Sequence, residues 1–96
     1  MTSSKPAAAE AGQFNILYFA SASSYTLKNT ESLPAPLPLS KLFGLLEERY
    51  KGIKENVLES GLVTVNLTYV DVEAEGEDMV IKEGDEVAII PPVSSG

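Results

Sequence analysis

The sequence predicts a small α+β domain in which one main helix packs on one face of a mixed sheet of four to five strands. Short apolar runs rich in β-branched and aromatic residues recur at 14–20, 62–70 and 86–90, as expected of strands. Apolar residues at helical spacing follow Ser40. A chain of 96 residues has room for one such domain with a modest core.

The first expected strand is FNILYFA, Phe14–Ala20, which is too short for a helix and apolar enough to be buried. The Ser- and Asn-rich run at 21–32 is expected to be a loop. In LPAPLPLS, Pro34, Pro36 and Pro38 remove every second backbone donor. A strand here must therefore lie at an edge of the sheet.

The main helix is expected to begin after Ser40, a favourable N-cap. Gly44 should weaken it by about 1 kcal/mol relative to alanine. A second short helical piece, 54–60, is expected to end at Gly61. We interpret Phe43 and Leu46 as core side chains. The helix pattern itself consists of Leu42, Leu45, Leu46, Tyr50 and Ile53.

The second half of the chain predicts further strands. In LVTVNLTYV, alternation of apolar and polar residues predicts one half-buried strand, in which Asn66 satisfies local backbone groups. A brief strand at MVI precedes the turn KEGDE, where Gly84 can adopt positive φ. EVAII is the last expected strand. The apolar positions of the alternating run are Val63, Val65, Leu67 and Tyr69.

We expect three segments: a flexible N-terminal extension at 1–13, the domain at 14–90 and an extended, functional C-terminal tail at 91–96. The extension is Ala-rich with one lysine and Pro6, unlike a secretory signal. No apolar run approaches the ~18 residues of a membrane span. The sequence therefore predicts a cytoplasmic protein without a membrane partner.

The chain is acidic, with 14 Asp and Glu against 7 Lys and Arg, for a net charge of −7. Nucleic acid and anionic membranes should repel such a surface, so partners should be basic. Lys82 is the single base in the segment from Asp71 to Glu86, which carries many of the acids. A solvated face is the favoured interpretation of this segment, and steering of a basic protein partner is the alternative.

The sequence contains no cysteine and no histidine. Disulfides, thiolate nucleophiles, Cys/His zinc sites and imidazole bases are thereby excluded. No convergent acid/base pair can be located either. We expect no catalytic residue and no metal site, so the chain itself should not be an enzyme.

VTVNLTYV, followed by MVIKEGDEVAIIPPVSSG, resembles the MoaD-type sulfur carriers, the family of molybdopterin synthase small subunits. The likeness covers Phe14 to Gly96. It implies a ubiquitin-like β-grasp fold, a form of the α+β class predicted above. It also implies that Gly96 is adenylated by an ATP-dependent activating enzyme and then converted to a thiocarboxylate.

The resemblance further implies the partners of such a carrier. The thiocarboxylate would enter the large subunit of molybdopterin synthase and donate sulfur to cyclic pyranopterin monophosphate, in molybdenum cofactor biosynthesis. Two copies of each subunit would form a heterotetramer. No cofactor would be bound permanently, because ATP would be consumed on the activating enzyme.

The residues of the tail independently suit this role. Without cysteine, sulfur can be held on an acyl carbon, and the Gly96 carboxylate is the one free of a side-chain environment. Pro91 and Pro92 favour an extended chain of ~3.1 Å per residue, so the six-residue tail could reach ~18 Å. The residues expected to enter the partner are Pro91, Pro92, Val93, Ser94 and Ser95.

Ser95 departs from the Gly-Gly ending of the family. Its Cβ restricts positive φ, so a channel built around two glycines could clash with it. Natural variation, an engineered change and reduced activation stay open as its origin and effect. Two alternative functions also stay open: a sister carrier for thiamine synthesis or tRNA thiolation, and a β-grasp interaction module without acyl chemistry.

Overall fold

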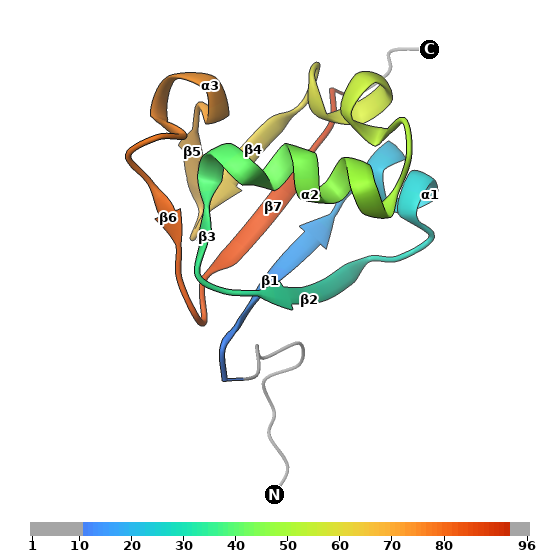
Figure 1. Cartoon of the computed structure of the whole chain (residues 1–96). Helices are drawn as coiled ribbons and strands as arrows, with labels where there is room; N and C mark the ends of the chain where they lie inside the picture. The colour runs from blue at the N-terminus through green and yellow to red at the C-terminus, as the bar shows by residue number, and fades with distance from the viewer. Residues whose placement is uncertain (1–10, 93–96) are drawn as a thin grey trace, which may run out of the picture.

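The computed structural model describes residues 11–92, which form a five-stranded sheet crossed on one face by a helix (Figure 1). Strands β1 and β7 lie side by side in parallel, and the other pairings in this sheet are antiparallel. The α+β class and the mixed sheet are thus confirmed. In spatial order the strands are β2 (Thr30–Pro34), β1 (Gln13–Tyr18), β7 (Glu86–Ile90), β4 (Leu62–Val65) and β5 (Thr68–Val70).

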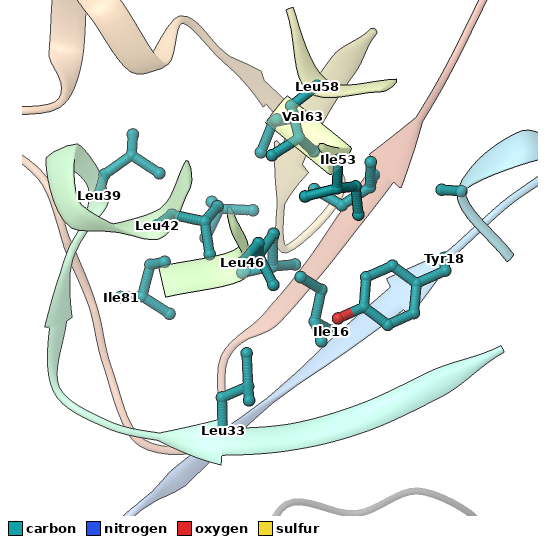
Figure 2. Close-up of a cluster of buried hydrophobic side chains, with 14 of the residues drawn as sticks. Ile16, Tyr18, Leu33, Leu39, Leu42, Leu46, Ile53, Leu58, Val63 and Ile81 are labelled. Carbon is teal, nitrogen blue, oxygen red and sulfur yellow. The ribbon is translucent and has the colours of Figure 1, made fainter. Parts of the chain in front are cut away.

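Helix α2 (Leu42–Arg49) covers the inner face of the sheet and buries Leu42 and Leu46. Figure 2 shows these side chains meeting Ile16, Leu33 and other strand residues in one apolar cluster. Phe43 is half-buried and packs against the same cluster. The assignment of Phe43 and Leu46 to the core is therefore confirmed.

The ends of the helix differ from the prediction. Ser40 is not its N-cap, because a 3₁₀ turn, η1 (Leu39–Lys41), comes first and Lys41 is the cap residue without a side-chain bond. The helix also ends before Ile53. The Glu47 carboxylate accepts hydrogen bonds from the Gly52 and Lys54 amides just beyond the end of the helix. The expected second helical piece is confirmed as the π-helical segment η2 (Lys54–Leu58).

The single strand expected over LVTVNLTYV is wrong, because β4 and β5 form a hairpin there. Asn66 and Leu67 make the turn, with φ of 51° and 72°. Two-residue hairpin turns need such positive φ values, for which Gly is the usual second residue. With Leu67 in that place, the turn carries no obvious sequence signal.

Two expected loops contain regular structure. The polar run holds α1 (Ser21–Thr26) and the start of β2, which lies at an edge of the sheet. The strand expected over 33–40 is confirmed only in part, because β2 ends at Pro34 and Leu37–Pro38 belong to a separate two-stranded sheet. The acidic connection after β5 holds α3 (Val72–Glu75), capped by Asp71. The expected brief strand is confirmed as β6 (Val80–Ile81), which pairs with β3 (Leu37–Pro38).

Candidate functional site

The candidate site begins where strand β7 ends at Ile90. Pro91 is buried and Pro92 is exposed, so the chain leaves the protein surface between these two residues. A proline has no backbone donor, so neither residue can extend the antiparallel ladder to β4. The remaining predicted tail residues, Val93, Ser94, Ser95 and Gly96, lie outside the described residues.

Strand β7 is held on both edges, by β1 and by β4. Its start is fixed by the KEGDE turn, where Gly84 has φ of +84° as predicted. The Asn66 side chain joins this turn to the β4–β5 hairpin: its amide donates to the Asp85 carboxylate and its carbonyl oxygen accepts from the Glu86 amide, both at 3.0 Å. Asn66 was predicted to satisfy local backbone groups within a strand. It instead lies in the hairpin turn and binds the start of β7, 19 and 20 residues along the chain. Strand β7, which leads into the C-terminal residues, is the central strand of the sheet.

The outer face of the sheet, opposite α2, carries exposed apolar side chains next to the base of the tail. Leu62 pairs with Ile90 across the β4–β7 ladder, and Phe19 follows the last residue of β1 on the other side. Phe19 is 47% exposed and Leu62 is 54% exposed. We call Phe19, Leu62 and Ile90 the apolar row.

Tyr69 extends this apolar surface along the outer face. It lies opposite Thr64 in the β4–β5 ladder and is 66% exposed. Contiguous exposed apolar surface on a soluble domain marks an interaction site. The outer face therefore offers a docking surface for a protein at the point where the tail departs.

The strongest electrostatic cluster lies elsewhere. The Glu31 side chain accepts hydrogen bonds from Tyr18, Tyr50, Arg49 and Lys28, between β2 and α2. Burial acts to raise the pKa of Glu31, but these four donors outweigh it and lower that pKa. Burial and the bond to Glu31 raise the pKa of Tyr18. Every polar group in this cluster has a hydrogen-bond partner, so we interpret the cluster as a structural link between β2 and α2.

Within residues 11–92, no group of acidic side chains is placed to hold a metal ion. The acidic segment from Asp71 to Glu86 is largely exposed and forms no salt bridge among the described residues. No helix in the part of the chain that the structure describes is long and apolar enough to cross a membrane. Among residues 11–92, the features at the end of β7 are therefore exposed apolar side chains rather than a cluster of metal-binding groups.

The sequence did not predict the side chains that surround the end of β7, and the predicted tail beyond Pro92 stays a prediction. Alternation along FNILYFA would have placed Phe19 on the opposite face from Tyr18, which was an available signal. Tyr69 was assigned to the buried face because the hairpin was not recognised. For Leu62 the sequence held no signal beyond strand position.

A mixed five-stranded sheet packed against helix α2 defines the class of fold: a ubiquitin-like β-grasp domain. The ThiS family matches residues 16–96. The molybdopterin synthase sulfur carrier subunit of Pyrenophora tritici-repentis is 59% identical over 95% of this chain and 98% of that protein. The chain therefore belongs to the ThiS family, among the molybdopterin synthase sulfur carrier subunits.

Solved structures agree on the fold. A putative molybdopterin converting factor subunit 1 of Pyrococcus furiosus has a TM-score of 0.66 at 27% identity, covering 84% of this chain and 98% of that one. Subunit 1 in the complex of subunits 1 and 2 of the Helicobacter pylori molybdopterin-converting factor has a TM-score of 0.62 at 23% identity, covering 88% and 99%. The predicted β-grasp fold is confirmed.

Proposed function

We propose that this chain is the sulfur-carrier subunit of a cytoplasmic molybdopterin synthase and that Gly96 carries the sulfur. The observation that carries the proposal is the 59% identity to a sulfur carrier subunit over 98% of that relative's length. The relatives act as carriers, and catalytic groups come from the partner. The ladder that ends at the paired prolines supports a tail that reaches into that partner.

The chemistry requires activation of a carboxylate, which is a poor acyl donor. A carboxylate oxygen of Gly96 attacks the α-phosphorus of ATP on the activating enzyme, and pyrophosphate leaves. A hydrosulfide-level donor then attacks the acyl carbon, loses its proton and displaces AMP, so that the tail ends in a thiocarboxylate. In the large subunit this sulfur passes to cyclic pyranopterin monophosphate, within a heterotetramer of two copies of each subunit.

We assign the docking of the large subunit to the outer face. The apolar row and Tyr69 flank the base of the tail, so a protein seated on them receives the tail directly. Interfaces commonly depend on a few aromatic and apolar anchors near their centre. Basic groups of the large subunit around this docking surface would complement the net charge of −7 of the carrier.

Deletion of Gly96 tests the carrier chemistry. The deletion displaces the carboxylate by ~3.3 Å in an extended chain, and ~1 Å of misplacement can already cost ~100-fold. We expect pyrophosphate exchange with the activating enzyme to be lost while the melting temperature stays unchanged. Intact mass of the parent chain after reaction should show one oxygen replaced by sulfur. Exchange at the parent rate in the deleted chain would leave an interaction module as the function.

Substitution of Tyr69 tests the docking surface. Tyr69→Ala should weaken binding of the large subunit by about 10- to 100-fold, as for an interface anchor. Leu27→Ala is the matched control, because Leu27 is 87% exposed but lies outside the sheet. Isothermal titration of both variants against the purified large subunit gives the comparison. Equal affinities of the two variants would place the partner on another surface.

A further inference from the structure

Gly61 lies against the base of the tail. It connects η2 to β4, and its neighbour Leu62 pairs with Ile90, the last residue of β7. A Cβ built on Gly61 would lie 3.1 Å from the Val57 carbonyl oxygen, 3.2 Å from the Ile90 carbonyl oxygen and 3.2 Å from Pro91 Cα. In Figure 1 the end of β7 lies beside the yellow-green segment that leads from η2 to β4.

The close approach is the reason for a glycine at this position. Gly61 does not adopt the positive φ that favours glycine at Gly52 and Gly84. All three nearest atoms belong to the backbone, so no side chain can rotate away from an added methyl group. The backbone of η2, the end of β7 and Pro91 therefore meet here more closely than most Cβ atoms tolerate.

From these distances we infer that Gly61 is a positioning residue, which sets the direction in which the tail leaves the sheet. The inference rests on the proposed function of the tail. A methyl group at Gly61 must displace its neighbours by a few tenths of an ångström. Over one ~3.8 Å Cα step, a ~0.3 Å shift of Pro91 tilts the chain by ~4–5°.

The tail amplifies such a tilt. Five residues follow Pro91, and in the extended conformation proposed for the tail inside a partner they would make an arm of ~15 Å at ~3.1 Å each. A tilt of ~4–5° moves the end of this arm by ~1 Å. Because ~1 Å of misplacement can cost ~100-fold in rate, a methyl group far from Gly96 should impair the reaction of Gly96.

The test is Gly61→Ala, with Gly44→Ala as the matched control. A Cβ on Gly44 meets nothing within 4 Å, so that variant adds the same methyl group in open space. In pyrophosphate exchange we expect Gly61→Ala to lower kcat by about 10- to 100-fold with KM for the carrier within about twofold, because the substitution removes no exposed side chain with which the activating enzyme could bind the carrier. Gly44→Ala should leave both constants at the parent values.

The double variant Gly44→Ala/Gly61→Ala separates positioning from stability. Gly44→Ala removes a helix-interior glycine and should raise the melting temperature by about 4–8 °C. If Gly61→Ala acted by loosening the fold, kcat would recover in the double variant, and the inference would be overturned. A kcat that stays low while the melting temperature recovers supports it.

A spin label on the Glu55→Cys variant gives a measurement that does not depend on activity. The label attaches at this position alone, because the chain has no other cysteine. Paramagnetic relaxation of the Ser94, Ser95 and Gly96 amides should differ between Gly61→Ala and its parent, and not between Gly44→Ala and its parent. Unchanged relaxation in Gly61→Ala refutes the inference, as does changed relaxation with parental kcat. Absent exchange in the parent chain would refute the proposed chemistry, while relaxation still decides whether Gly61 directs the tail.

Discussion

Replacement of Glu31 by glutamine should destabilise the fold more than any other isosteric change at an acidic residue within the described chain. The Glu31 side chain is 6% exposed and accepts from the Tyr50 hydroxyl at 2.6 Å, Arg49 at 2.7 Å, the Tyr18 hydroxyl at 2.8 Å and Lys28 at 3.3 Å. Glutamine keeps the size but removes the charge. It also turns an acceptor into a donor that faces other donors.

The magnitude follows from the exposure of each partner. The bonds from Tyr18 and Tyr50 are part-buried and charge-assisted, and losing that assistance costs about 1–2 kcal/mol each. Arg49 and Lys28 are nearly half exposed, so solvent screens their ion pairs and the two tyrosine bonds dominate. Together these two bonds account for about 2–4 kcal/mol, or a fall of about 8–32 °C in melting temperature.

Urea unfolding at two pH values provides the assay. The hydrogen bonds lower the pKa of Glu31 below its ordinary value of 4.5, so its contribution is present above that value and lost as pH falls through the folded-state pKa. The stability gap between parent and Glu31→Gln should therefore be full near neutral pH and shrink in acid. Glu48→Gln, at an exposed helix position, is the control. A gap below about 0.5 kcal/mol, or one that does not shrink in acid, would refute the reasoning.

Three further outcomes are expected. Gly44→Ala should raise the free energy of unfolding by about 0.5–1 kcal/mol in urea titrations, because its Cβ would meet open space, and a loss of stability would contradict this. Leu67→Gly should stabilise by a similar amount, since Leu67 holds φ of 72°, with thermal melts as the check. If the segment from Asp71 to Glu86 steers the partner, stopped-flow association should slow steeply with salt while dissociation changes little, whereas flat association rates would make it a solvated face.

The sequence predicted those helices and strands whose residue pattern depends on the element alone and not on its neighbours in the fold. Helix α2 was predicted from apolar residues at helical spacing, strands β1 and β7 from short apolar runs, and the Gly84 turn from its residue types. The β4–β5 hairpin could not be found that way, because apolar residues continue at alternate positions through Leu67 and Tyr69, whereas the turn places Thr68 opposite Val65 and so moves Tyr69 to the other face. Leu67 at positive φ is held by the hairpin itself, so its residue type predicts the opposite conformation.

The same distinction between local and long-range determinants applies to the candidate site. The end of β7 at Ile90 was predictable, because the prolines that follow it act locally and cannot donate to the ladder. The partners of the tail base are contributed by distant segments: Leu62 and Gly61 come from β4 and its approach, and Phe19 comes from the end of β1. Their relevance depends on which strands are neighbours, and no local pattern specifies that order.

The proposed function makes the placement of β7 important, because this strand leads into the C-terminal residues that would carry the sulfur. Under that proposal, accurate delivery depends on how well the end of β7 is fixed. Asn66 sets the register at one end of β7, and Gly61 closes the backbone on Pro91 at the other. These two residues contribute no reacting atom. Even so, substitutions there should change delivery more than substitutions in the exposed acidic segment, because they move the origin of the tail while charges on the surface alter only the approach of the partner.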